Sequence, residues 1–462
     1  MFKSRRSLYY RKHNRKPLPL MVIIAAIPLV LIILELLAWL IVNFTGNGSA
    51  LLAYKGEPAE DNAYRLKFLG QNQQPYDGIL DKGSLAVYRN LAGGYSLVGD
   101  QQSDFWRINE QGFRDDDPIP LAKPQDEIRI FLLGGSTAFG QRNASNQATI
   151  ASKLETRLNQ RIDQQRRSPE KYRPTFLPVY RPELIKALAK PPKIKDGQYR
   201  VINSAVPGYT SGNELAQLAL QILPYSPDAI IVLDGYTDLM LPSNQQETTI
   251  PKTEAFLNNA PGHFWTHITQ QWKNAIAQTH LIKAIQKWLF RPEPSISQRS
   301  LVVNDETLPL EQHLAPDEAE LKQRIARYRN HHQQMIRLTT GAGIPLVVAI
   351  QPEITGYEQA QMSPQEQELV SKLGTLYQKQ LPIGYAELIK ASQGLEKAFP
   401  KNIKVLNFYN LFKDIEQKNV TPKVFFTDAV HLTEEANQVL SERYYQALTA
   451  QPKLQVTPPK KP

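Results

Sequence analysis

The feature that most constrains this chain is a long apolar run near its N-terminus, "LPLMVIIAAIPLVLIILELLAWLIVNF", from Leu18 to Phe44. It exceeds the ~20 apolar residues that a helix needs to cross the hydrocarbon core of a bilayer, and it is longer than the apolar region of a signal peptide. We therefore expect one transmembrane helix over residues 19–44. The alternative is a signal peptide cleaved within "GNGSA", Gly46 to Ala50.

The charges that flank this run predict its orientation. Residues 1–18 carry seven Lys or Arg side chains and no acidic one. Basic residues collect on the cytoplasmic side of a membrane helix, so residues 1–18 should form a cytoplasmic tail. The chain after Phe44 should then lie outside the cytoplasmic membrane, in the periplasm or the extracellular space.

One acidic side chain, Glu35, interrupts the apolar run. A carboxylate inside a membrane helix costs a few kcal/mol, which by default indicates a partner helix or an ion path. The alternative is a glutamate that is protonated or that reaches toward water.

The charge of the remaining chain excludes several classes of partner and cofactor. The net charge is +10, but the N-terminal tail and three Lys residues in the last twelve account for all of it. A neutral body argues against an extended nucleic-acid-binding face. The absence of cysteine excludes disulfides, thiolate metal sites and cysteine nucleophiles. No cluster of His, Asp and Glu has metal-ligand spacing, so we expect neither a metal nor a cofactor.

Beyond the membrane segment, apolar runs alternate with helical patterns. Residues 45–125 form a turn-rich connecting region to which the sequence assigns no fold. The predicted strands are Ile128–Leu133, Val201–Asn203, Ala229–Leu233, Pro345–Gln351 and Val405–Phe408, and the helical patterns begin at Thr149, Asn213, Asp317, Ser363 and Thr433. This alternation predicts an α/β domain with a parallel sheet over residues 126–450.

Three stretches depart from that rhythm. Polar, Pro-containing insertions occupy about residues 167–198 and 242–316, and we expect the second to pack over the sheet edge because it contains aromatic helical pieces. The Lys/Pro-rich end, residues 451–462, is predicted to be disordered.

A glycine pair and a serine end the first predicted strand, in "EIRIFLLGGSTAFG" from Glu127 to Gly140. A phosphate-binding loop would need a Lys where Gln141 and Arg142 stand. The dinucleotide pattern lacks its second glycine at Ser136, and the nucleophile elbow lacks its last glycine at Ala138. A turn that presents the Ser136 hydroxyl above the sheet remains, although a serine nucleophile needs a base.

The candidate base is His431, in "FFTDAVHLTEEAN". Asp428 precedes it by three residues, a spacing at which a tight turn can point carboxylate and imidazole at one another. The alternative is a helix-capping Asp with a surface His. We expect the consecutive His331 and His332, on a long polar helix, to be solvated.

At this point four ordered blocks resemble the SGNH (GDSL-like) hydrolase superfamily, in particular its membrane-anchored or secreted bacterial members. They are "LGGST", "VINSAVPGYTSGNEL", "PDAIIVLDGYTDL" and "TDAVHLTEEAN", and "INEQGFRDDD" from Ile108 to Asp117 resembles the lead-in segment of the subgroup. The resemblance covers about residues 109–450. It implies a three-layer α/β/α, flavodoxin-like domain, here preceded by one transmembrane helix.

The resemblance also implies a role for each block. Ser136 falls on the nucleophile position, with Gly135 where many members have Asp, and Asp428 and His431 fall on the acid and the base. Ser136, Gly208 and Thr237 fall on the three oxyanion-hole positions. Thr237 departs from the family, which has asparagine there, and losing such a donor costs on the order of 2.7 to 4 kcal/mol in a related type of site.

The activity implied is that of a serine esterase or O-acyltransferase without cofactor or metal. From its expected location, we predict that it acts on acyl esters of envelope glycans, exopolysaccharides or lipids, and that its partners are the membrane and such a substrate rather than nucleic acid. The alternative is a catalytically impaired SGNH-like binding or scaffolding domain in an envelope or polysaccharide-assembly complex. Thr237 and the long insertion motivate that alternative.

Overall fold

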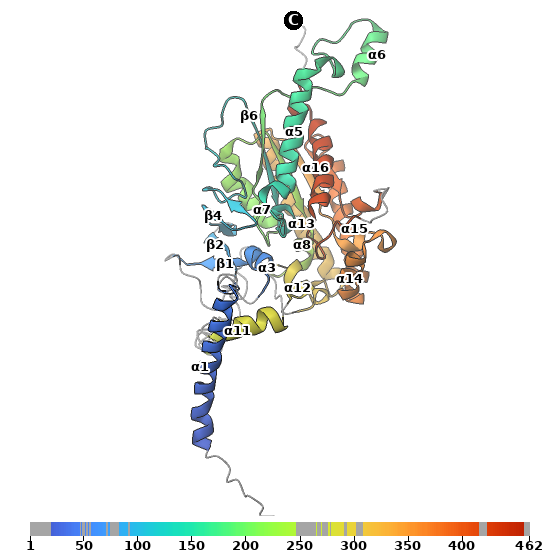
Figure 1. Ribbon diagram of the computed structural model, residues 1–462. Helices are drawn as coiled ribbons and strands as arrows, with labels where there is room; N and C mark the ends of the chain where they lie inside the picture. The colour runs from blue at the N-terminus through green and yellow to red at the C-terminus, as the bar shows by residue number, and fades with distance from the viewer. Residues whose placement is uncertain are drawn as a thin grey trace, which may run out of the picture. The chain divides into compact units, whose positions relative to one another are not determined.

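The computed structural model describes residues 20–46, 48, 51, 54, 57–70, 73, 83–90, 93–245, 265, 269, 276–277, 279–290, 293–301, 308–414 and 423–456, without the side chains of residues 20–25 (Figure 1). The predicted tail over residues 1–18, residues 457–462 and about half of the predicted insertion at 242–316 lie outside these ranges. The chain divides into two compact units, Met1–Glu57 with Gln270–Pro292, and Pro58–Thr269 with Glu293–Pro462.

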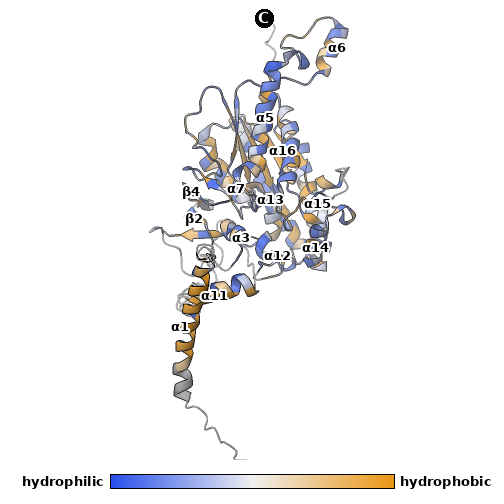
Figure 2. Ribbon diagram, in the orientation of Figure 1, coloured by the Kyte–Doolittle hydropathy of each residue, from blue (hydrophilic) through white to orange (hydrophobic). Residues whose placement is uncertain are grey.

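The first unit is built on the helix α1 (Leu20–Phe44). Its segment Ala26–Phe44 has a mean hydropathy of 2.5 and is long and apolar enough to cross a membrane, although a signal sequence near an N-terminus meets the same criteria. Figure 2 shows the coloured part of this helix as hydrophobic. The unit also contains α11 (His280–Ala284) and the π-helical turn η5 (Ile285–Phe290).

The second unit is organised around a five-stranded sheet. Its strands run in the order β7-β6-β8-β9-β10, and every neighbouring pair is parallel. With β6 counted as the first strand this is the flavodoxin-like order 2-1-3-4-5. The predicted α/β fold with a parallel sheet is confirmed. The bounds are β6 Glu127–Gly134, β7 Gln198–Asn203, β8 Ala229–Asp234, β9 Leu346–Ile350 and β10 Ile403–Asn407.

Helices cover both faces of this sheet because alternate residues of each strand point to opposite sides. Ile130 and Leu132 of β6 belong to one apolar core, with α5 (Ile150–Arg167) and α16 (Glu434–Thr449). Phe131 and Leu133 belong to the other, with residues of the helices on the opposite face. Those helices are α7 (Ser211–Gln217), which continues as the π-helical turn η3 (Leu218–Ile222), α13 (Glu318–Ala342) and α15 (Thr375–Ala398).

The helical pattern that begins at Ser363 forms two helices instead of one. They are α14 (Pro364–Lys372) and α15, separated by Leu373 and Gly374. Gly374 caps α15, and a Cβ atom there would lie 1.9 Å from a carboxylate oxygen of Glu311. Glu311, from a distant segment, thus approaches the break closely in a way that no local pattern reveals.

Residues 58–125 belong to the same unit as the sheet. They include α3 (Ala59–Tyr64) and a small sheet of order β1-β2-β3, in which β2 is parallel to β1 and antiparallel to β3. Its strands, and those of a two-stranded ribbon, are β1 Leu66–Leu69, β2 Leu85–Asn90, β3 Gly94–Leu97, β4 Gln101–Gln102 and β5 Arg107–Ile108. The region to which the sequence assigned no fold thus contributes part of the α/β unit.

The insertions and the C-terminal end contain further ordered pieces. The insertion at about 167–198 carries α6 (Arg181–Ala189), and α12 (Ile296–Ser300) lies near the end of the second insertion. The predicted disordered tail is ordered up to residue 456, where the N–H of Val456 donates to the carbonyl of Lys193 at 2.9 Å.

Candidate active site

Ser136 stands at the sharp turn between strand and helix. The strand β6 ends at Gly134, Gly135 caps the helix α4 (Ser136–Phe139), and Ser136 is its first residue. Gly134 has φ +152° and a Cβ there would lie 2.4 Å from the carbonyl oxygen of Leu233, so no other residue fits this turn without strain. The turn holds Ser136 at the carboxyl end of the sheet, where open α/β sheets bind ligands.

The C-terminal end of the short helix α4 is fixed by two buried side chains from other segments. Arg114 donates from Nη1 to the carbonyls of Phe139 (3.0 Å) and Gly140 (2.8 Å). Asn203, at the end of β7, donates from Nδ2 to the same Phe139 carbonyl at 3.0 Å. The last carbonyls of a helix lack partners within it, so these two donors complete a helix that is too short to be stable alone.

Asp428 and His431 form a fully buried pair in the loop before α16. Oδ2 of Asp428 lies 2.7 Å from Nδ1 of His431, and Oδ1 accepts the backbone N–H groups of Val430 (3.0 Å) and His431 (2.9 Å). The loop closes on itself because the N–H of Thr427 donates to the carbonyl of His431 at 2.9 Å. These contacts leave Nε2 as the imidazole nitrogen that can face a reacting group.

The Asp428 carboxyl is held in its charged form. Burial raises its pKa, but the charge and hydrogen bond of His431, the Arg142 guanidinium and the Val430 N–H act in the other direction and outweigh it. The net result is a pKa below the ordinary range of an aspartate. A charged carboxylate at this place orients the imidazole and stabilises an imidazolium.

The nucleophile turn and the Asp–His loop are joined by side-chain hydrogen bonds. Thr137, next to Ser136, donates from Oγ1 to the carbonyl of Val430, next to His431, at 3.2 Å. Asn143, just after α4, donates from Nδ2 to the carbonyl of Leu432 at 3.0 Å. These bonds place the turn of Ser136 next to the loop of Asp428 and His431, which come from opposite ends of the domain.

The serine and the histidine are not hydrogen-bonded to each other in this structure. Nε2 of His431 is buried and has no hydrogen-bond partner among the described residues. Ser136 is itself nearly buried, with 8% of its surface exposed. Hydrogen bonds of catalytic groups are often long in unliganded enzymes and tighten when substrate binds.

The two other predicted oxyanion-hole residues follow the next two strands. Gly208 comes after β7 and has φ +85°, a conformation that favours glycine. Thr237 lies on α8 (Tyr236–Met240), directly after β8. A Cβ atom on Gly135 would lie 3.5 Å from Oγ1 of Thr237 and 3.1 Å from the carbonyl of Tyr209. The Thr237 hydroxyl and the loop of Gly208 thus both lie beside the turn that carries Ser136.

A hydrogen-bonded clamp joins these two segments. Asp238, next to Thr237, accepts the backbone N–H of Ser211 at Oδ2 (3.1 Å) and the Ser211 hydroxyl at Oδ1. Nδ1 of His331 lies 2.9 Å from the same hydroxyl. The clamp sets the spacing between the loop of Gly208 and the helix of Thr237.

The expectation that the two consecutive histidines are solvated was wrong. His332 is 1% exposed, and its Nε2 lies 3.1 Å from Oδ2 of Asp234, at the end of β8. Burial lowers the pKa of His332, but the charge and hydrogen bond of Asp234 outweigh it and raise the pKa. The helix that carries these histidines packs against the sheet on one face, and its periodicity alone did not reveal which face.

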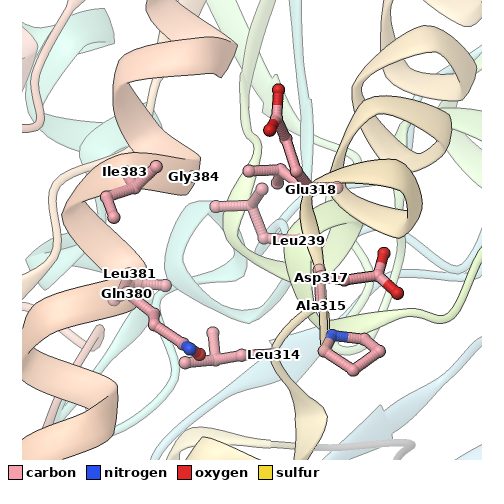
Figure 3. Close-up of a pocket in the computed structure, with 11 residues that line it drawn as sticks. Leu239, Leu314, Ala315, Asp317, Glu318, Gln380, Leu381, Ile383 and Gly384 are labelled. Atoms are coloured by element: carbon pink, nitrogen blue, oxygen red, sulfur yellow. The ribbon is translucent and has the colours of Figure 1, made fainter.

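An apolar pocket of about 350 Å³ lies next to α8 (Figure 3). Leu239, two residues beyond Thr237, forms part of its wall between the start of α13 and the middle of α15. Figure 3 shows the carboxylates of Asp317 and Glu318 on one side of it and Gln380 and Ile383 on the other. Its remaining lining residues are Leu314, Ala315, Pro316, Leu321, Leu381 and Gly384.

The predicted site residues follow successive strands of the sheet. Ser136 follows the first strand, Gly208 the second, Thr237 the third, and the Asp428–His431 loop follows the last. This is the order that the resemblance to SGNH-type hydrolases implies. The resemblance seen in the sequence blocks is thus matched by the fold of the domain that carries them.

Among known proteins, only solved structures are similar to this chain. No family model matches the chain, and no curated protein does. One similar solved structure is a lipase/acylhydrolase from Enterococcus faecalis, with 12% identity, a TM-score of 0.33 and coverage of 70% of this chain and 95% of that chain. A GDSL-like lipase from Bacteroides thetaiotaomicron has 12% identity, a TM-score of 0.29 and coverage of 69% of this chain and 87% of that chain. The acetyl xylan esterase AlAXEase has 11% identity, a TM-score of 0.33 and coverage of 70% of this chain and 100% of that chain. At these identities and TM-scores the similarity does not identify an activity.

Proposed function

We propose that the SGNH domain is a serine ester hydrolase or O-acyltransferase. The observation that carries the proposal is the buried Asp428–His431 pair, which hydrogen bonds from Thr137 and Asn143 tie to the turn of Ser136. A serine is a weak nucleophile unless a base and an orienting group accompany it. In this proposal His431 is the base and Asp428 is the orienting group.

The chemistry follows from the three side chains. As Oγ of Ser136 attacks an ester carbonyl, its proton passes to Nε2 of His431, whose Nδ1–H is held by Asp428. The C–O bond to the leaving alcohol then breaks, and that alcohol takes the proton from Nε2. Water or a sugar hydroxyl next attacks the acyl-serine, giving up a proton to Nε2 of His431. The bond between the acyl carbon and Oγ of Ser136 then breaks, Oγ takes that proton back, and the acyl group leaves as acid or as a new ester.

The oxyanion formed in each step needs donors at the turn. The backbone N–H groups of Ser136 and Gly208 and the hydroxyl of Thr237 are the candidates. The N–H groups at the start of a helix have no partner within the helix, so that of Ser136 is available to a ligand. The hydroxyl of Thr237 would donate to the same oxyanion, although the threonine side chain is shorter than that of asparagine.

We propose further that α1 anchors the chain in the cytoplasmic membrane as a single-pass helix and that the SGNH domain lies outside the cytoplasm. The seven basic residues before the apolar run support this orientation. A domain in that position meets acyl esters of envelope glycans, exopolysaccharides or lipids, and these are the substrates that we propose.

A fluorophosphonate probe tests the catalytic part of the proposal. The detergent-solubilised full chain should be labelled and should hydrolyse p-nitrophenyl acetate. The Ser136→Ala variant should lose both, whereas Ser371→Ala, which changes an exposed serine, should keep both. Absence of labelling together with absence of turnover in the unaltered chain would refute a serine hydrolase.

A non-catalytic SGNH-like binding or scaffolding domain is the second candidate. Two observations favour it, namely the threonine at position 237 and the absence of a hydrogen bond to Nε2 of His431 from the described residues. Such a domain should bind acylated polysaccharide with the same affinity in the Ser136→Ala variant and should not react with the probe.

A further inference from the structure

The acidic residue inside the apolar helix α1 has its partners within the same compact unit. Oε1 of Glu35 accepts the backbone N–H of His280 at 2.7 Å and lies 2.9 Å from Nδ1 of that histidine. Oε2 accepts the backbone N–H of Leu281 at 2.8 Å. Glu35 therefore satisfies the first N–H groups of α11, which have no partners inside their own helix.

The position of Glu35 along α1 determines how deep in a bilayer these contacts would lie. It stands nine residues before Phe44, the last residue of α1. At about 1.5 Å per residue, Glu35 lies about 13 Å along the helix from that end. The hydrocarbon core of a bilayer is about 30 Å thick. If α1 spans the membrane, a partner of Glu35 must reach well below the headgroups.

The segment that reaches Glu35 carries large exposed apolar side chains at its C-terminal end, beyond Lys283 and Lys287. Leu289 is 74% exposed and Phe290 71% exposed, and Trp288 is also exposed. Large apolar side chains gathered on an exposed surface indicate contact with a membrane or a protein partner. These residues belong to the same compact unit as α1, with which α11 is in contact.

We propose that α11 and η5, residues 280–290, form a second membrane element that enters the outer leaflet beside α1 and contacts lipid acyl chains. The proposal rests on the membrane anchorage proposed above. Inside a bilayer every backbone polar group needs a partner from protein, and Glu35 provides partners for the exposed end of α11. Glu35 in turn is retained in an apolar helix because two backbone N–H groups and an imidazole surround its carboxylate.

The segment 280–290 is joined to the SGNH domain by the chain on both of its sides. The chain passes between the two compact units three times, at residues 57–58, 269–270 and 292–293. A membrane-inserted segment 280–290 would tether the domain at three points in the sequence instead of one.

Site-directed spin labelling tests this proposal directly, because the natural chain has no cysteine. The full chain is reconstituted in vesicles of phosphatidylcholine and phosphatidylglycerol with a nitroxide at Leu289→Cys. Leu37→Cys on α1 is the reference for the bilayer interior, and Val179→Cys, in the exposed part of the first insertion, is the aqueous reference. The ratio of oxygen to nickel-chelate accessibility measures depth.

The label at position 289 should show a ratio several-fold above that at 179 and close to that at 37. Glu35→Ala should move the label at 289 toward the aqueous value, and Leu36→Ala, its neighbour on α1, should not. An aqueous value at 289 beside an interior value at 37 would overturn the proposal. An aqueous value at 37 would instead remove the membrane anchorage on which it rests, while Ser136 labelling reports the catalytic proposal separately.

Discussion

Oδ2 of Asp428 lies 2.7 Å from Nδ1 of His431, with both side chains fully buried. Because the carboxylate fixes the tautomer that leaves Nε2 free to accept a proton, Asp428→Asn should lower kcat on the order of 10³- to 10⁴-fold. Hydrolysis of p-nitrophenyl acetate measures this, with the exposed Asp196→Asn as control. An unchanged rate would show that the pair is only structural.

The lowered pKa of Asp428 leads to a prediction about how activity depends on pH. Since His431 and its neighbours hold that pKa below the ordinary range, the carboxylate stays charged at neutral and mildly acidic pH. A fall of kcat/KM toward acid should therefore come from protonation of another group. An acid limb that persists in Asp428→Asn supports this, and its disappearance would contradict it.

A second prediction concerns the oxyanion hole. Thr237→Val keeps the shape of the side chain and removes the hydroxyl that lies beside Gly135. If this hydroxyl donates to the oxyanion, kcat should fall, by at most the 10²- to 10³-fold that a strong donor supplies. Thr237→Asn should raise kcat above that of the natural chain. The hydroxyl has no such role if the valine variant keeps its kcat, and a lower kcat in Thr237→Asn would mean that the longer side chain does not reach the hole.

The parts of the site that sequence could predict are those with local signals. The strand that stops at Gly134, the serine after it and the three-residue spacing of Asp428 and His431 are readable because each is set by a single turn. The fold class follows for the same reason, since each strand and helix carries its own apolar period.

The parts that sequence missed depend on contacts between distant segments. Arg114 supports α4 from a loop, and Asp238 reaches Ser211 across two strand ends. His332 is buried although it stands in a polar helical pattern, because one turn of α13 faces the charged end of β8. The partner of Glu35 comes from a segment about 245 positions later in the chain. No short pattern encodes such pairings.

A third prediction tests the support of the nucleophile helix. Arg114 is 3% exposed and donates to the carbonyls of Phe139 and Gly140 and, from Nε, to Oδ1 of Asn146 at 2.9 Å. Lysine has no planar fork and cannot make these bonds together. Each buried acceptor left without a partner costs about 1–3 kcal/mol, so Arg114→Lys should lower Tm clearly and slow labelling of Ser136. Arg166→Lys, at an exposed ion pair, should change neither, and an Arg114→Lys variant with natural Tm would contradict the prediction.

A fourth prediction uses a buried carboxyl near the Asp428 loop. Glu353 is fully buried, accepts the N–H of Thr355 at 2.8 Å and the hydroxyl of Tyr377 at 3.1 Å, and precedes Ile354, whose N–H donates to the carbonyl of Ala429. Burial raises the pKa of Glu353 to about 7, against the opposing effect of these hydrogen bonds. Between an unfolded pKa of about 4.3 and pH 7 the folded chain keeps a proton here that the unfolded chain has lost.

Stability from this group must therefore decrease as pH rises through that window, by up to roughly 1.4 kcal/mol per pH unit. The Glu353→Gln variant has no proton to lose, so its free energy of unfolding should depend less steeply on pH between 5 and 7 than that of the natural chain. Denaturant unfolding followed across this range measures the two slopes. The surface variant Glu387→Gln should keep the natural slope, because its carboxyl is exposed. Parallel slopes for Glu353→Gln and the natural chain would mean that Glu353 is already ionised in the folded protein.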